Sequence, residues 1–376
     1  MADIPQRIAD LAASQPQLPV SWYLDPEMFA LEQRRIFADT HGYVGHEAMV
    51  PEVGDYHTLA WAGHGQMLAR SDAGVGLLSN VCRHRQALML EGRGNLHNIV
   101  CPMHRWTYDL QGKLIGAPEF EDRPCRDLET WPLQNWRGLL FAGPRDVAKD
   151  LAAFSLAHEF DYSGLVYYGT TVDELPFNWK SFLEVYLELY HVEAIHPGVS
   201  RFVDPGNFSW EFGERWSNQV LGVYAGLMRP GTPAYAKYQE VLLAHRGGEP
   251  PRYGTLWFIL YPNVMLEWYP EALVVSTLIP RSASHTTNVV DFFYPEEIFH
   301  FEPHIVAAHQ AAYLETAAED AGACERLQRG RQALYTRGAD DRGPYQSPTE
   351  DGMVHFHEFL RRQLAPHLAQ IERSGV

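Results

Sequence analysis

Cysteine is scarce in this sequence, because 376 residues contain only Cys82, Cys101, Cys125 and Cys324. A secreted protein of this length that depends on disulfide bonds for stability needs more cysteines, so we expect no disulfide framework. We expect Cys125 and Cys324 to be small buried residues without a chemical role. Cys82 and Cys101 differ from them because each has a histidine close by in the sequence.

Long apolar runs are also absent. The most apolar stretch, Leu256–Tyr261, ends at Pro262 and is far shorter than the ~18 residues that a membrane helix needs. Asp3, Arg7 and Asp10 interrupt the segment in which a signal peptide would have its apolar core. We therefore expect a cytoplasmic protein that does not span a membrane.

Positive charge is in short supply, because 30 Lys and Arg residues face 47 Asp and Glu residues and leave a net charge of −17. Such a field repels phosphate backbones and anionic lipids, so we expect neither nucleic acid nor a membrane surface as a partner. The hydrophobic content of 46% and the charged content of 20% are ordinary for a globular protein. At ~150 residues per domain, the length suggests two domains or slightly more.

The residue composition and the hydrophobic pattern change along the sequence and divide the chain into three parts. Residues 1–40 predict an N-terminal arm with a helix that begins at Pro26, behind Asp25 as its N-cap. From about Gly42 to Pro144 the sequence holds short strand-like runs punctuated by Gly, Asp and Pro, which is typical of a small all-β domain. After about Arg145 it mixes long helices with strands, so the chain as a whole is predicted to be of the α+β class.

The sheet of the third part is predicted from β-branched and aromatic runs that turn residues separate, as in an antiparallel sheet. These runs are Leu256–Tyr261, Val264–Tyr269, Leu273–Pro280 and Thr286–Tyr294. The preceding segment, Arg201–Gly254, is rich in Gly, Pro and aromatic residues, and we expect it to form loops over a pocket.

Two motifs in the β-rich part each pair a cysteine with a histidine. Separated by sixteen residues, they are Cys82-Arg83-His84 and Cys101-Pro102-Met103-His104. Two thiolates and two imidazoles are the ligand set of a Rieske [2Fe–2S] centre, in which both histidines bind one iron. Zinc also accepts two cysteines and two histidines, so the ligand types alone leave zinc open.

With their flanks, C-R-H-R at Cys82–Arg85 and C-P-M-H-x-W at Cys101–Trp106, these motifs resemble those of the Rieske non-heme iron oxygenases, large (alpha) subunit. Two positions depart from the family pattern. Gln86 stands where glycine is frequent, and Met103 stands where an aromatic residue is common. The resemblance implies a [2Fe–2S] cluster whose ligands are Cys82, His84, Cys101 and His104.

A second group of polar residues lies on a predicted helix, Ser181–His191, which is apolar almost all round and should therefore be buried. Glu184, Glu188 and His191 are four and three residues apart, so they share one stripe of this helix. Burying them unpaired costs several kcal/mol, which a metal ion or a tight hydrogen-bond network would offset. For Glu184, support of such a site and pairing with Lys180 are both open.

His196 lies about 140° further round an ideal helix than His191, so both face one ion only if the helix ends or deforms. Pro197 supplies an ending, because the residue before a proline is pushed out of helical geometry. The resulting pattern E-x-x-H-x-x-x-x-H-P, from Glu188 to Pro197, resembles the iron-binding motif of the same family, which normally begins with aspartate.

The third ligand is expected far downstream, on a helix from about His304 to Leu334. Asp320 falls on the buried stripe of this helix, whereas Glu319 and Glu325 are expected to face elsewhere. The segment around Asp320 resembles the third-ligand segment of the family, which implies Asp320 as the ligand and leaves Glu319 as the second choice. Two histidines and one carboxylate hold mononuclear Fe(II) and leave open positions for oxygen and substrate.

The resemblance gives Glu188 a further role. In the family, this carboxylate hydrogen-bonds an iron-binding histidine and a Rieske histidine of the neighbouring subunit, so Glu188 would connect His191 with His104 of another chain. Aspartate is commoner at this position, although carnitine-type oxygenases also use glutamate. A buried glutamate that backbone donors satisfy is the alternative.

The resemblance covers most of the chain and implies a β-sandwich Rieske domain at 41–150 and a helix-grip catalytic domain at 151–376, on which the 1–40 arm packs. It also implies the terminal component of a multicomponent oxygenase, a monooxygenase or dioxygenase that uses O₂ to hydroxylate an aromatic or other small organic substrate, as in aromatic hydrocarbon catabolism. Because the bridge through Glu188 runs between chains, a head-to-tail homotrimer is implied.

Electrons are expected from a separate NAD(P)H-dependent reductase, with or without a ferredoxin. The sequence has no G-x-G-x-x-G after a strand and no plant-type ferredoxin cysteine set, so it shows no nicotinamide or flavin site of its own. From other functional classes, a Rieske electron carrier and a zinc-stabilised binding module are the alternatives.

The residues expected at the substrate are Phe258, Glu267 and Trp268. Aromatic side chains on the predicted strands suit an apolar cavity, with plain core packing as the alternative. Glu267 interrupts an apolar strand beside Trp268, which suits a cationic ligand unless this carboxylate faces water. Because of Glu188 and Glu267, a second function remains an alternative: a quaternary-ammonium (carnitine- or betaine-type) or N-demethylating monooxygenase.

Overall fold

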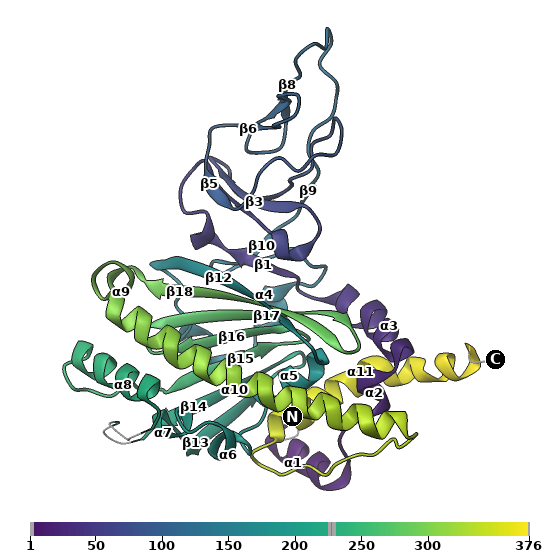
Figure 1. Ribbon diagram of the computed structural model, residues 1–376, viewed down its shortest axis with the longest axis vertical. Helices are drawn as coiled ribbons and strands as arrows, with labels where there is room; N and C mark the ends of the chain where they lie inside the picture. The colour runs from purple at the N-terminus through teal and green to yellow at the C-terminus, as the bar shows by residue number, and fades with distance from the viewer. Residues whose placement is uncertain (1–3, 225–226, 228–230, 375–376) are drawn as a thin grey trace. The chain divides into compact units, whose positions relative to one another are not determined.

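Two compact units make up the chain in the computed structural model (Figure 1), which describes residues 4–224, 227 and 231–374. The smaller unit consists of His41–Lys149 and Asp161–Tyr167. The larger unit consists of Met1–Thr40, Asp150–Phe160 and Tyr168–Val376. The N-terminal segment therefore belongs to the same unit as the C-terminal part of the chain.

The smaller unit is all-β, as the punctuated runs predict. Within the described residues, a five-stranded sheet has the order β5-β2-β3-β4-β9, and two three-stranded sheets have the orders β1-β11-β10 and β6-β7-β8. Every pairing in these sheets is antiparallel. The strands are β1 (Tyr43–His46), β2 (Asp55–Thr58), β3 (Gln66–Ser71), β4 (Gly74–Ser79), β5 (Arg93–Asn95), β6 (Ile99–Val100), β7 (Thr107–Tyr108), β8 (Leu114–Gly116), β9 (Thr130–Trp131), β10 (Gln134–Trp136) and β11 (Leu139–Phe141). Short helical turns are η2 (Glu47–Met49) and η3 (Ala60–Ala62).

A seven-stranded sheet forms the centre of the larger unit, with the order β12-β18-β17-β16-β15-β14-β13 in the part of the chain that is described. From β13 to β18, neighbouring strands run antiparallel. The four predicted runs correspond to β15 through β18. The strands are β12 (Leu165–Leu175), β13 (Val203–Phe212), β14 (Trp216–Val223), β15 (Thr255–Leu260), β16 (Val264–Tyr269), β17 (Ala272–Ser282) and β18 (His285–Pro295).

Helices of the larger unit pack against this sheet, and Figure 1 shows α10 running along one face of it. Helix α10 packs against α5 and α8, and Leu183, Met265 and Cys324 meet in the core between helices and sheet. Asp25 caps α3 as predicted, because its side chain accepts a hydrogen bond of 2.8 Å from the Glu27 N–H. The helices are α1 (Ile4–Ser14), α2 (Ser21–Leu24), α3 (Pro26–Arg35), η1 (Phe37–Asp39), α4 (Val147–Asp150), η4 (Ser155–His158), α5 (Trp179–Tyr186), α6 (Val192–Ile195), α7 (Val199–Phe202), α8 (Pro233–His245), α9 (Glu296–Phe301), α10 (Pro303–Thr336) and α11 (Asp351–Ser374).

Two sequence-based expectations need correction. The segment Arg201–Gly254 is not a series of loops, because it contains β13, β14 and α8; residues 225–226 and 228–230 within it lie outside the described residues. The strands escaped notice because buried polar residues, such as Asn218 and Gln219, hide the alternation that marks a strand. Cys324 is buried as expected, but Cys125 is exposed.

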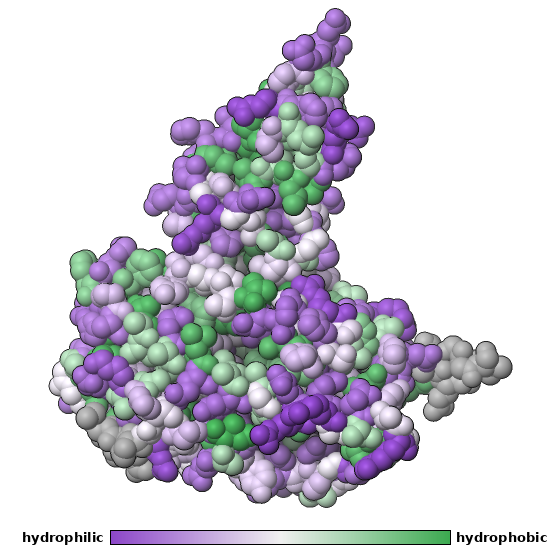
Figure 2. Space-filling model, in the orientation of Figure 1, coloured by the Kyte–Doolittle hydropathy of each residue, from purple (hydrophilic) through white to green (hydrophobic). Residues whose placement is uncertain are grey.

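No helix in the described part of the chain is long and apolar enough to cross a membrane. The face of the molecule in Figure 2 agrees with this, because hydrophilic residues cover much of it and the hydrophobic patches between them are scattered.

Candidate metal centres and active-site pocket

Two tight turns of the smaller unit carry the cysteine and histidine motifs. The first turn follows β4, and the second connects β6 to β7. The Gln86 N–H donates to the Cys82 carbonyl at 3.0 Å, and the Arg105 N–H donates to the Cys101 carbonyl at 3.1 Å. Gln86 and Arg105 have φ angles of +56° and +60°. This left-handed geometry is the reason that glycine would suit position 86.

The four predicted cluster ligands gather at these turns. Cys82 and Cys101 are buried, and their thiols interact with each other. The ring centroids of His84 and His104 are 4.6 Å apart. Nδ1 of His84 is buried without a hydrogen-bond partner, although buried polar atoms normally have one. An unpartnered imidazole nitrogen beside two thiols fits the donor set of a [2Fe–2S] cluster.

The second site begins where α5 ends. Asn178 caps this helix, because its side chain accepts a 3.0 Å hydrogen bond from the Lys180 N–H. The helix stops at Tyr186, and a turn leads to His191 and the short helix α6. His196 follows α6 with φ −109° and ψ 81°, outside helical geometry, as the proline behind it predicts. The predicted helix up to His191 is therefore wrong, but the predicted break at His196 is present.

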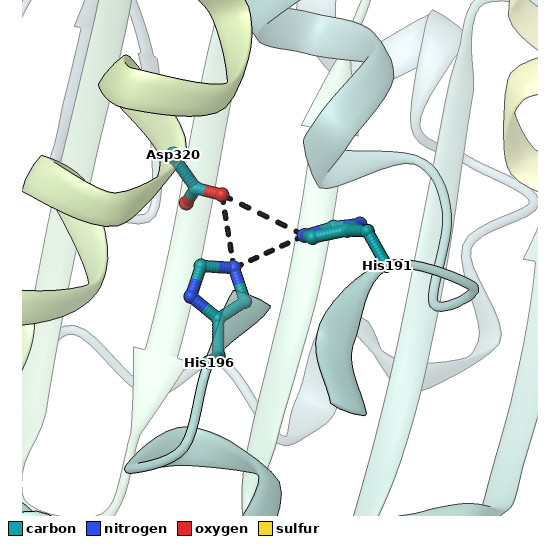
Figure 3. Close-up of side chains that lie close together, drawn as sticks. All are labelled: His191, His196 and Asp320. Carbon is teal, nitrogen blue, oxygen red and sulfur yellow. Dashed lines mark hydrogen bonds and ion pairs between the residues drawn. The ribbon is translucent and has the colours of Figure 1, made fainter. Parts of the chain in front are cut away.

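Figure 3 shows His191, His196 and Asp320 pointing toward one another. The Nε2 atoms of the two histidines are 3.0 Å apart. Oδ1 of Asp320, on α10, lies 3.0 Å from Nε2 of His196 and 3.6 Å from Nε2 of His191. Oδ1 is buried and forms no hydrogen bond of acceptable geometry, so three lone pairs converge on one point. Two imidazoles and one carboxylate arranged in this way fit a mononuclear iron with open positions.

The electrostatics of this second site suit a bound cation. Burial lowers the pKa of His191, but Asp320 and Glu188 outweigh burial and raise it to about 9. Burial raises the pKa of Asp320, but the two imidazoles outweigh burial and lower it. The site therefore gathers negative charge, which a metal ion neutralises while the imidazoles serve as neutral ligands.

Two carboxylates hold the far sides of the imidazoles. Glu188 accepts a hydrogen bond from Nδ1–H of His191 and another, of 3.1 Å, from the backbone N–H of the same residue. Glu319 accepts from Nδ1–H of His196 at 2.7 Å. These bonds leave Nε2 of each ring free to act as a ligand. The expectation that Glu319 faces elsewhere is wrong, because Glu319 and its neighbour Asp320 both reach His196.

Glu184 belongs to a different cluster, in the core. Its carboxylate accepts hydrogen bonds at 2.5, 2.9 and 3.0 Å from Tyr23, Arg331 and His357. Lys180 pairs with Glu32 at 2.5 Å instead. The predicted stripe of Glu184, Glu188 and His191 does not form because α5 ends at Tyr186. Neither alternative left open for Glu184, site support or direct pairing with Lys180, describes what the structure shows.

A small pocket opens beside the three clustered residues; its cavity volume of about 20 Å³ is room for about one water molecule. Its wall is formed by His191, His196 and Asp320 together with Val185, Tyr186, Val192, Val199, Trp257, Tyr269, Tyr313, Thr316 and Ala317. All of these residues belong to the larger unit. A wall of aliphatic and aromatic side chains with a few polar groups suits a small organic substrate.

The prediction that Phe258 and Trp268 meet the substrate is wrong for this pocket. The ring of Phe258 packs 4.6 Å from that of Phe154, and the ring of Trp268 lies 6.2 Å from that of Phe160. Successive side chains of a strand point to opposite faces of the sheet. Phe258 and Trp268 therefore lie on the face away from the pocket.

The opposite face of the same strands supplies the pocket wall. Trp257 on β15 and Tyr269 on β16 line the pocket, and Glu267 shares this face of β16. The alternation of side chains between the two faces of these strands is the sequence pattern that could have predicted Trp257 and Tyr269 as pocket residues. Tyr186 and Tyr313 were also missed, and they come from helices whose approach to the sheet is a property of the tertiary fold.

Family models match both units of the chain. The model described as "Rieske [2Fe-2S] domain" matches residues 41–132, and the one described as "Ring hydroxylating alpha subunit (catalytic domain)" matches residues 157–366. The chain is also 55% identical to putrescine 2-hydroxylase of Ralstonia nicotianae, over 94% of this chain and 97% of that protein. The chain belongs to the Rieske oxygenase alpha subunits.

Two further similarities concern other members of this family. Putrescine 2-hydroxylase of Bordetella bronchiseptica is 48% identical over 96% of this chain and 87% of that protein. The solved structure of a quaternary ammonium Rieske monooxygenase matches with a TM-score of 0.76 and 22% identity, covering 94% of this chain and 98% of that chain. The structural match shows the shared fold.

As a Rieske oxygenase alpha subunit, the protein is an oxidoreductase whose cofactors are a Rieske [2Fe–2S] cluster and a mononuclear iron. The residues at both sites fit these groups. Membership in the family excludes the zinc-stabilised module and the simple electron carrier that the cysteine and histidine motifs left open. Rieske oxygenases need a reductase and form multimers.

Proposed function

We propose that this Rieske oxygenase hydroxylates a small aliphatic diamine of the putrescine type. The observation that carries the proposal is the 55% identity to a putrescine 2-hydroxylase over 94% of this chain. In such a monooxygenase reaction, one atom of O₂ enters a C–H bond as a hydroxyl group and the other leaves as water. Two electrons and two protons complete the balance, with the electrons supplied by a separate NAD(P)H-dependent reductase, with or without a ferredoxin.

The sites described above define the residue roles that we propose. Cys82, His84, Cys101 and His104 hold the Rieske cluster, which delivers electrons one at a time. His191, His196 and Asp320 hold the mononuclear iron, which supplies the oxygen chemistry. In support, the ligand atoms of this trio converge and Oδ1 of Asp320 is left without a hydrogen bond.

The carboxylates around the trio fix the imidazole rings. Glu188 and Glu319 each hold a proton on the Nδ1 atom of a histidine, which aims Nε2 at the iron position. We propose that Glu188 also bridges His191 to His104 of a neighbouring subunit, in a head-to-tail homotrimer. The support is the resemblance of the Glu188 motif to the family pattern, together with a side chain that is 13% exposed and so remains reachable from outside.

The side chains that line the pocket support the proposal of a small substrate with an ammonium group. Apolar side chains such as Val185 and Val199 exclude water from the methylene chain of a diamine, and aromatic rings such as Trp257 attract ammonium groups. A quaternary-ammonium substrate is the second candidate, because an aromatic wall attracts a methylated ammonium as well. The predicted aromatic substrate remains a prediction, as do aromatic hydrocarbon catabolism and dioxygenation.

The domain organisation is also part of the proposal. We place an N-terminal arm at residues 1–40, the Rieske domain at 41–150 and the catalytic domain at 151–376, in a cytoplasmic enzyme. The family models, which match residues 41–132 and 157–366, support these boundaries. The compact units support them too, because the first forty residues group with the larger unit.

Coupled oxygen uptake tests the proposed substrate. The holoenzyme is supplied with a reductase and NADH and is offered putrescine, carnitine, glycine betaine and benzoate in separate reactions. We expect NADH and O₂ consumption to be coupled only with putrescine, together with a product that is one oxygen atom heavier by mass spectrometry. Coupled turnover of carnitine or betaine alone would favour the quaternary-ammonium candidate, and turnover of benzoate alone would contradict both.

A further inference from the structure

Glu267 is a buried carboxyl group in the middle of the sheet. It lies on β16, is 1% exposed, and has apolar neighbours along the strand. Its carboxylate accepts hydrogen bonds from Tyr269 at 2.8 Å, Ser276 at 3.3 Å and Tyr313 at 3.4 Å. Among the described residues, these partners are hydroxyl groups and not cations. A buried carboxylate without a cation costs several kcal/mol, so this position needs an explanation.

The location of Glu267 supplies that explanation. Tyr269 and Tyr313 line the same pocket as His191, His196 and Asp320. The Glu267 carboxyl therefore lies one hydrogen bond behind the pocket wall, on the side of the sheet that faces the candidate iron site. The Trp257 indole N–H donates to the Tyr269 hydroxyl at 3.2 Å, which fixes the direction in which that hydroxyl points.

We propose that Glu267 is the counter-charge for an ammonium group of the substrate and acts through the phenol oxygens of Tyr269 and Tyr313. The inference rests on the proposed function and extends it to the residue that selects a primary ammonium group. Each phenol donates its proton to Glu267 and so presents an oxygen lone pair to the pocket. An ammonium N–H donates to that oxygen, and the carboxylate behind it stabilises the positive charge.

Burial opposes the charged form of Glu267 as long as no cation is near. It raises the pKa of Glu267 to about 8, against the opposing effect of the three hydroxyl donors. An empty pocket at neutral pH therefore holds mostly the protonated carboxyl group. A cation in the pocket favours the carboxylate and supplies the charge that the described partners of Glu267 do not.

Glu267→Gln tests the proposal, because it keeps the shape and an acceptor oxygen but removes the charge. The binding of putrescine and of its neutral counterpart 1,4-butanediol to the holoenzyme is measured by calorimetry. We expect the Kd for putrescine to rise about 10- to 100-fold, the range for a hydrogen-bonded charge, and the Kd for butanediol to change less than about twofold. Steady-state kinetics should show the change mainly in KM. Glu240→Gln on the exposed surface of α8 makes the same change of charge and should leave both affinities as in the wild type.

Tyr269→Phe provides a second test that does not depend on how the buried glutamine is accommodated. It removes the phenol oxygen that we propose as the acceptor for the ammonium group and should also weaken putrescine more than butanediol. Equal affinities of wild type and both variants for putrescine would overturn the role of Glu267, with the proposed function intact. If the wild-type enzyme neither binds nor oxidises putrescine, the proposed function fails, and this role fails with it.

Discussion

Replacing Glu319 with glutamine tests whether the carboxylate that hydrogen-bonds the His196 imidazole helps to hold the candidate iron site. The Glu319 carboxylate accepts a 2.7 Å hydrogen bond from His196, and its side chain is only 24% exposed, so water competes weakly for the imidazole. Loss of such a partner typically lowers metal affinity 10–100-fold. Glutamine retains an acceptor oxygen and loses only the charge, so we expect the low end, about tenfold, which corresponds to about 1.4 kcal/mol.

A chelator titration of the holoenzyme measures this effect. Total iron is followed together with the visible absorbance of the Rieske cluster, which serves as an internal reference because its ligands lie in the smaller unit. We expect Glu319→Gln to release the mononuclear iron at about tenfold lower chelator concentration. Glu325→Gln, an exposed change on the same helix, is the matched control and should follow the wild type. Coincident curves for Glu319→Gln and wild type would refute the reasoning.

Three further predictions follow from other carboxylates. In Glu188→Gln both metal centres should remain, but single-turnover reoxidation of the cluster should slow at least tenfold; an unchanged rate would contradict the bridge. Burial raises the pKa of Glu184, but its charged and hydrogen-bonding partners, Arg331 first among them, lower it to about 2. We therefore expect Glu184→Gln to lower the free energy of unfolding at pH 7, measured in urea, by about 3 kcal/mol. That difference is present above pH ~4.5 and should disappear as the pH falls toward ~2; a constant or absent difference would contradict the ion pair. Putrescine binding should release close to one proton from the Glu267 carboxyl group at pH 7 and almost none above about pH 9. Calorimetry in two buffers measures this release, and the same release in Glu267→Gln would contradict the assignment to Glu267.

The sign of the proton release follows from the groups around Glu267. Burial and the charge of Asp320 on α10 raise the pKa of Glu267, whereas its hydroxyl partners on β16, β17 and α10 lower it. A bound ammonium opposes that effect and lowers the pKa, so the carboxyl group loses its proton when the substrate enters. Alkylammonium groups resemble lysine, whose pKa is about 10.4, and they therefore stay charged across this range. Affinity should rise with pH up to about 8 and then level off.

Much of the fold could be predicted because the local signals agree with it. Strands β15 to β18 are apolar and β-branched, and turn residues separate them, so their positions follow from the sequence. The Asp25 cap and the long helix α10 were found by the same local rules. Strand β14 was missed because polar side chains such as Asn218 are buried on the sheet, and only the packing of the whole unit accounts for them.

Of the candidate site, too, one part could be predicted from the sequence and another part could not. Asp320 was predicted because it lies on the buried stripe of one long helix, and His196 because Pro197 ends the helical geometry before it. Glu319 was the second choice as a ligand, but its hydrogen bond with His196 could not be predicted, because this carboxylate reaches His196 only once α6 and α10 have come together. Two of the three predicted substrate residues, Phe258 and Trp268, lie on the wrong face of the sheet, because strand alternation fixes which residues share a face and does not say which face meets the pocket.

The most direct test of the account counts iron and acid-labile sulfide in the purified enzyme and in Asp320→Ala. We predict about three iron and two sulfide per chain in the wild type, and about two of each in the variant with the absorbance of the cluster unchanged. Three iron retained in Asp320→Ala, or only two in the fully loaded wild type, would contradict a second iron site at His191, His196 and Asp320.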